Sequence, residues 1–181
     1  MYADHTLTPK EAVRLCALGT LALAPMRYGD LAIAIRHFIS RVVGPTPEIM
    51  GHSVELLKYE GLVETAEGSD ENALLRITDA GRAQMRALLV ADLRPSNTEL
   101  NTLITALKFR FLHLLPLDEQ QKQAELLYAA VEREIARLQD LRRHPSGAVG
   151  FLAEWLDHHI ATLEGRLEWL GILRDRLSAP V

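Results

Sequence analysis

Apolar residues recur at helical spacing through most of this chain, and a single short stretch interrupts that pattern. Residues 62–66 and 73–77 are runs of strand-forming character, and the Gly-, Ser- and Asn-containing link between them is typical of a turn. A strand pattern in only one place predicts one small β-hairpin within an otherwise helical protein. The expected fold class is therefore mainly α.

Capping signals divide the chain around the hairpin into four helices. Thr8, followed by Pro9 and Glu11, is a helix start in which the Thr and Glu side chains satisfy free backbone N–H groups. Proline and glycine stop helices, because proline lacks an N–H and glycine readily adopts positive φ. The residues predicted to begin or end these helices are Thr8, Pro25, Asp30, Gly44, Thr46, Gly61 and Thr78.

The second half is predicted to hold three more helices. The first ends at Pro116, the second is expected to be capped by Asp118 and to run to about Arg143, and a turn at residues 144–147 precedes the third. In the third, leucines and isoleucines alternate in three- and four-residue steps, as in helices that pack lengthwise. The residues predicted to form a dimer contact are Leu152, Leu156, Ile160, Leu163, Leu167 and Leu170.

A break at Arg94-Pro95-Ser96 predicts two domains, residues 1–94 and 95–181. No secretory signal or long apolar segment is evident, which predicts a soluble cytoplasmic protein without membrane contact. The net charge is −4, and residues 1–94 contain ten Lys and Arg against twelve Asp and Glu. Bulk charge thus gives nucleic-acid binding no support, and any such function must come from the local arrangement of residues.

Three helices, a hairpin and a further helix within 90 residues is the order of a winged helix-turn-helix, in which the third helix enters the DNA major groove. The expected architecture is this domain with a β-hairpin wing, followed by an antiparallel helical dimerisation domain. Side chains on the first turns of helix three would meet base edges, and cations and a tyrosine elsewhere would meet phosphates. The predicted base-edge residues are Thr46, Glu48, Ile49, His52 and Ser53, and the predicted phosphate contacts are Tyr28, Arg36, Arg41 and Arg76. Glu48 is equally explained as a helix-start residue, and each arginine as a solvated surface charge.

Residues 56–63 and 76–82 resemble the end of the recognition helix and the strand-to-helix junction of PadR-type regulators. Residues 163–170 resemble the ending common in the same family, so the similarity covers nearly the whole chain. The resemblance implies a homodimeric repressor that binds double-stranded DNA at a pseudo-palindromic operator. It also implies control by a small effector, possible examples being aromatic compounds.

Two features depart from that family. Gly51-His52 stands where an aromatic-Pro pair is common, and the hairpin tip carries Glu67, Asp70 and Glu71, which repel phosphate. The alternative function is a winged-helix protein-interaction module that has lost DNA binding.

Other candidate sites are less specific. Trp155 and Trp169 are fourteen residues apart and share one helix face, which suits an effector pocket or aromatic dimer packing equally. His158 and His159 are adjacent and diverge on a helix, and no chelating partner follows them at the right spacing, so no metal is expected. No residue set predicts catalysis or a cofactor.

Overall fold

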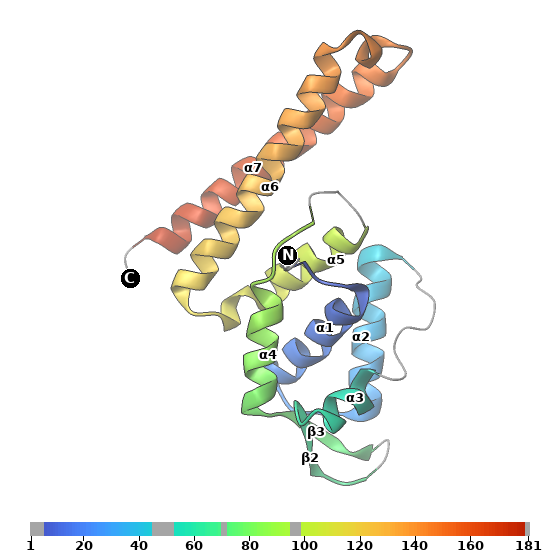
Figure 1. Ribbon diagram of the computed structural model, residues 1–181, viewed down its shortest axis with the longest axis vertical. Coiled ribbons are helices and arrows are strands. Elements are labelled where there is room, and N and C mark those ends of the chain that lie inside the picture. The colour runs from blue at the N-terminus through green and yellow to red at the C-terminus, as the bar shows by residue number, and fades with distance from the viewer. Residues whose placement is uncertain (1–5, 45–52, 70–71, 95–98, 180–181) are drawn as a thin grey trace, which may run out of the picture. The chain divides into compact units, whose positions relative to one another are not determined.

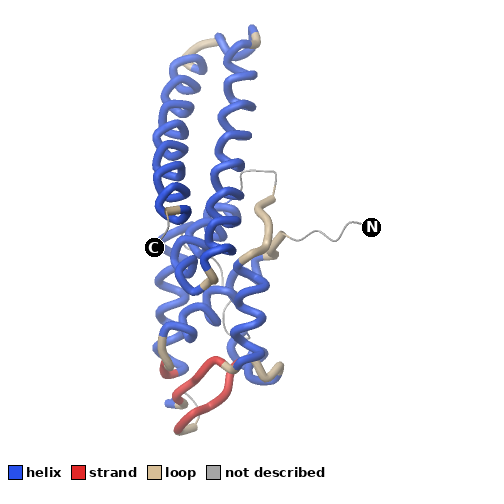
Figure 2. The backbone as a smooth tube through the Cα atoms, turned by 90° about the vertical axis from the view of Figure 1, so that its left-hand side faces the viewer, coloured by secondary structure: helices blue, strands red, loops and turns tan. Residues whose placement is uncertain are grey.

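The computed structural model describes residues 6–44, 53–69, 72–94 and 99–179, and the chain divides into two compact units at residues 115/116. Most described residues are helical, and the first unit contains a three-stranded antiparallel sheet (Figures 1 and 2). This confirms the predicted class, a mainly α protein with a winged helix-turn-helix followed by a helical unit. None of the described helices is both long and apolar enough to cross a membrane.

Helix α1 (Pro9–Leu23) is at the centre of the first unit and contacts α2, α3, α4 and α5. Its start confirms the predicted capping box, since the Thr8 N–H donates to Glu11 Oε2 (2.7 Å) and the Glu11 N–H donates to Thr8 Oγ1 (3.3 Å). Gly19 allows the close approach of the Phe111 ring, because a Cβ at this position would lie 2.6 Å from Phe111 Cδ2.

Helix α2 (Tyr28–Val43) begins earlier than predicted. Arg27 is the residue before its first turn, and Asp30 lies within that turn, so the prediction of Asp30 as the cap is wrong. The reason is tertiary: the Tyr28 N–H donates to the carbonyl of Ala73 (3.0 Å), distant in the sequence, which satisfies a backbone group that a cap would otherwise serve.

Helix α3 (Ser53–Tyr59) ends at the predicted glycine. Gly61 has φ +72°, its N–H donates to the Lys58 carbonyl (3.0 Å), and the Leu62 N–H donates to the Leu57 carbonyl (2.9 Å). This is a Schellman ending, which favours glycine because other residues are strained at positive φ. The predicted helix start at Thr46 lies outside the described residues.

Strands β2 (Val63–Glu67) and β3 (Leu74–Ile77) form the predicted hairpin. A third strand, β1 (Met26–Arg27), pairs with the other edge of β3 and gives the order β1-β3-β2. The sequence did not predict β1, because two residues are too few to show a strand period. Leu75 and Ile77 are buried, and α4 (Asp79–Leu89) follows directly, capped by Thr78 as predicted.

Helix α5 (Glu99–Phe111), followed by a 3-10 turn at Leu112–Leu114, packs against α1, α2 and α4. The first unit therefore ends at residue 115, whereas the sequence placed a domain boundary at 94/95. Local turn residues mark where a helix breaks, and tertiary packing decides which unit the next helix joins.

The second unit is an antiparallel pair of long helices, α6 (Leu117–Arg143) and α7 (Leu152–Ser178), joined through a 3-10 turn at Pro145–Ala148. At one end Gln121 donates to the Leu177 carbonyl (2.8 Å), and at the other Arg142 pairs with Asp157 (2.8 Å). Pro116, not Asp118, precedes the first turn of α6. The predicted cap is therefore wrong, because the helix already begins at Leu117.

Candidate nucleic-acid interface

The described part of α3 has one face in the core and one face exposed. Val54 and Leu57 are buried, whereas Glu55, Leu56 and Tyr59 are exposed, and Tyr59 is 90% exposed. An amphipathic helix anchored in this way leaves its outer face exposed to solvent. The sequence-based site did not include Leu56 or Tyr59, although their helical offset from the apolar pair Val54 and Leu57 was a usable signal.

Helix α3 is also held by charge. The Arg14 guanidinium of α1 contacts Glu60, with 2.8 Å between Nη1 and Oε2 and 2.9 Å between Nη2 and Oε1. Both side chains are partly buried, which suits a two-pronged contact. The pair joins the end of α3 to the central helix and limits how far α3 can rotate within the unit.

Of the residues predicted to meet base edges, Thr46, Glu48, Ile49 and His52 lie outside the described residues, and Ser53 is the first residue of α3. The predicted phosphate contacts are distributed over two elements. Arg36 and Arg41 are exposed on α2, and Tyr28 is half-buried at the start of that helix.

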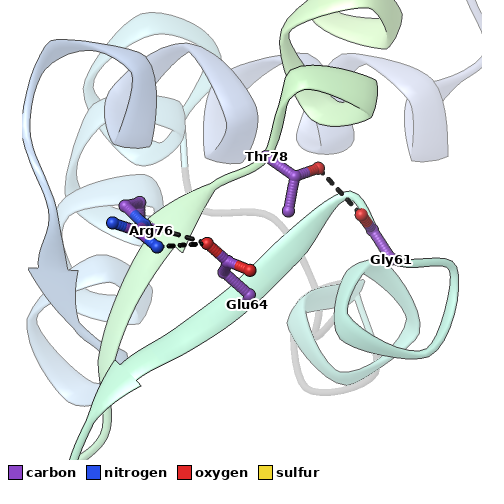
Figure 3. Close-up of polar contacts among 4 residues, drawn as sticks. All are labelled: Gly61, Glu64, Arg76 and Thr78. Atoms are coloured by element: carbon purple, nitrogen blue, oxygen red, sulfur yellow. Dashed lines mark hydrogen bonds and ion pairs between the residues drawn. The ribbon is translucent and has the colours of Figure 1, made fainter.

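The wing carries Arg76, the fourth predicted phosphate contact, and pairs it with an acidic partner. Arg76 lies opposite Glu64 in the strand register, and its Nε and Nη2 atoms donate to Glu64 Oε1 at 2.9 and 2.6 Å (Figure 3). Arg27 of β1 donates through Nη1 to the Asn72 carbonyl (2.9 Å). A carbonyl has no net charge, so this contact orients Arg27 without neutralising it.

Thr78 joins the end of α3 to the start of α4. Its Oγ1 donates to the Gly61 carbonyl (2.8 Å) (Figure 3). The same oxygen accepts from the Gly81 N–H (3.0 Å), and the Thr78 N–H donates to the Leu62 carbonyl (3.1 Å). One threonine therefore satisfies groups at two helix ends.

The leucine stripe of α7 packs against α6 of the same chain. Leu156, Ile160, Leu163 and Leu170 are buried, and Leu152 and Leu167 are partly buried. The lengthwise partner expected from the pattern is thus present within the chain, and a dimer contact through these six residues stays a prediction.

The opposite face of α7 exposes large apolar groups. Trp155 is 54% exposed and Trp169 is 48% exposed, and the Trp155 ring stacks on His159 with 5.1 Å between ring centres. Phe151 and Ile172 are also exposed. In the parts of the chain that the structure describes, no group of three or more His, Cys, Asp or Glu side chains is placed to hold a metal ion.

The fold and the arrangement of α3 beside the wing define a winged helix-turn-helix protein. Over residues 2–174 the chain matches the family model described as "Putative AphA-like transcriptional regulator", and it belongs to that family. No curated protein matches the chain. The family supports the predicted class of transcriptional regulator, whereas the PadR-like assignment is not confirmed.

Proposed function

We propose that this protein is a DNA-binding transcriptional regulator that acts as a homodimer. The observation that carries the proposal is the winged helix-turn-helix unit, with α3 anchored by Val54 and Leu57 and its outer face exposed, in a chain of the AphA-like regulator family. Regulators of this fold read DNA with the third helix in the major groove.

Direct readout of base edges falls to the segment that leads into α3 and to the start of that helix. Among the residues predicted from the sequence to meet base edges, Thr46 and Ser53 can bond to base edges or phosphate, His52 can donate to a purine, Ile49 can touch a thymine methyl, and Glu48 can accept from a cytosine amino group. Arg36 and Arg41, exposed on α2, supply phosphate attraction, with Tyr28 at the helix entrance.

The exposed face of α7 is the proposed dimer contact. Phe151, Trp155, Trp169 and Ile172 are exposed large apolar side chains that form two clusters, one toward each end of the helix, with His158, Thr162 and Gly165 between them. Exposed apolar side chains gathered on one face favour an interaction surface. A second copy offers the same two clusters and can cover them symmetrically. Two recognition helices about one turn of DNA apart would then read a pseudo-palindromic operator. The proposed outcome of that binding is repression.

A small aromatic effector is the proposed control. Trp155 and Trp169 belong to the proposed dimer contact, so a flat ligand bound against either ring, between the two copies, would alter their packing. It would change DNA binding only if it favours one arrangement over the other.

Enrichment of genomic DNA fragments on the purified protein, at low and at moderate salt, tests the proposal. The test variant is Arg36→Ala with Arg41→Ala, and the matched control is Lys122→Ala with Arg137→Ala, which removes two exposed cations from α6 instead. A salt-sensitive palindromic site, lost in the test variant and kept in the control, is expected. A third variant, His52→Ala with Ser53→Ala, is expected to lose the site while keeping weak non-specific binding.

Enrichment of no DNA at either salt would overturn the proposal. The alternative, a protein-interaction module that has lost DNA binding, would then be favoured. The exposed carboxylates of Glu64 and Glu67 on the wing are the observation that supports this alternative.

A further inference from the structure

The three-stranded sheet presents one outer face on which charges are arranged by strand register. Leu75 and Ile77 of β3 point into the core, so Arg76 between them points outward. Glu64 is in register with Arg76, and Arg27 of β1 is in register with Leu74, two residues before Arg76. Arg27, Arg76 and Glu64 therefore share the outer face.

Glu67 is a fourth charged residue at the same edge. After an irregularity in β2 it is in register with Leu74, so its carboxylate faces an apolar residue across the hairpin and not an arginine. Glu64 and Glu67 thus carry the same charge on the same strand, and they differ in what lies opposite them.

The Glu64 carboxylate holds the Arg76 guanidinium by two hydrogen bonds, from Nε and Nη2 to the same oxygen (Figure 3). The Arg76 side chain is 58% exposed and that of Glu64 is 48% exposed, so both remain reachable from solvent. A phosphate that approached Arg76 would have to replace Glu64 as its partner. It would also meet the displaced carboxylate at close range, and like charges repel.

We propose that Glu64 sets the affinity of the protein for non-specific DNA, because its carboxylate neutralises the charge of Arg76 on the wing. Its carboxylate occupies Arg76, so the wing contributes little to sequence-independent attraction for the DNA backbone, and binding depends on helix three. The inference rests on the proposed DNA-binding function, and it adds that Glu64 weakens non-specific binding to DNA. An acidic wing is then a means of selectivity and not a sign of lost DNA binding, since specificity is the ratio of specific to non-specific affinity.

Glu64→Gln tests the proposal by removing the charge while keeping the size of the side chain. Fluorescence anisotropy with a labelled random-sequence duplex should show affinity about five- to tenfold higher at low salt, because one cation becomes available and one carboxylate near the backbone is lost. The slope of log K against log salt should steepen by about 0.9, the value for one further phosphate contact.

Glu67→Gln is the matched control, since it removes an equal charge from the same strand without releasing an arginine. It is expected to raise affinity by less than about twofold and to leave the salt slope unchanged. A gain equal to that of Glu64→Gln would overturn the proposal, because loss of any wing carboxylate would then suffice.

Arg76→Gln completes a double-mutant cycle. It should change wild-type affinity little and should abolish the gain in the Glu64→Gln background. Strong loss of binding in the Arg76→Gln single variant would overturn the inference, because Arg76 would then already contact phosphate despite Glu64.

The two levels of the hypothesis can be separated. Binding of the duplex by wild type without any gain in Glu64→Gln refutes the affinity-setting role alone. Absence of binding by wild type and by every variant at low salt refutes the DNA-binding function, and the proposed role of Glu64 with it.

Discussion

Lys108 is a fully buried amine in the first unit, and its protonation is linked to folding. Its Nζ donates to the carbonyls of Leu89 (2.6 Å) and Ala91 (2.7 Å), at the end of α4. Burial lowers the pKa of Lys108 from 10.5 to about 8, although the negative charge of Asp92 acts in the opposite direction. The charged form is thus less favoured in the folded chain than in the unfolded chain.

This lowered pKa predicts stability that rises with pH. Below about pH 8 Lys108 is protonated in both the folded and the unfolded chain. Between about pH 8 and 10.5 it keeps its proton only in the unfolded chain, so the free energy of unfolding increases with pH, by about 3 kcal/mol over the whole range. Urea unfolding of wild type and of Lys108→Met across this range measures the effect as a difference. A difference that stays flat or falls with rising pH would show that the amine is not desolvated in the fold.

At the level of elements, the junction of α3, the wing and α4 depends on Thr78. Its hydroxyl caps α4 through the Gly81 N–H and also donates to the Gly61 carbonyl at the end of α3. Gly81 reinforces the junction, because a Cβ there would lie 2.7 Å from Ile77 Cγ1. The hydrogen bonds of Thr78 therefore help to position α3, the wing and α4 relative to one another.

Thr78→Val keeps the shape of the side chain and removes the hydroxyl, so it should lower the free energy of unfolding by about 1–3 kcal/mol. Thr78→Ser keeps the hydroxyl and should cost less than about 1 kcal/mol. Urea titration followed by circular dichroism measures both. A larger loss in Thr78→Ser than in Thr78→Val would mean that the methyl group, and not the hydrogen bonds, stabilises the junction.

At the scale of the whole molecule, the two faces of α7 have different roles. The Leu156–Leu170 face is buried against α6, and the face with Trp155 and Trp169 is exposed. We therefore expect a second copy to cover the tryptophan face, and the internal hairpin to survive when that contact is broken.

Trp169→Glu places a charge in the proposed contact and should convert the dimer to a folded monomer at micromolar concentration, because burying an unpaired carboxylate is unfavourable. Light scattering measures the mass, and circular dichroism checks the helix content. The matched control is Leu117→Glu, an apolar residue of similar exposure on α6 (46% against 48%), which should stay dimeric. A monomeric wild type would remove the two-half-site reading of DNA.

The sequence by itself determined the features that depend on local chemistry. The Thr8 and Thr78 caps, the Gly61 stop and the hairpin all follow from a few neighbouring residues, because capping and positive φ act within one turn. These signals were sufficient for the winged-helix order and for the class of regulator that the family match supports.

Only the tertiary structure decided what depends on distant partners. Strand β1 exists because β3 offers a free edge, α5 joins the first unit through packing on α1 and α2, and α6 covers the leucine stripe of α7. The pairing of Arg76 with Glu64 is of the same kind, since the strand register brings together residues that the sequence separates by a turn. Charge and periodicity can be read from a sequence, but which partner satisfies them is decided by packing.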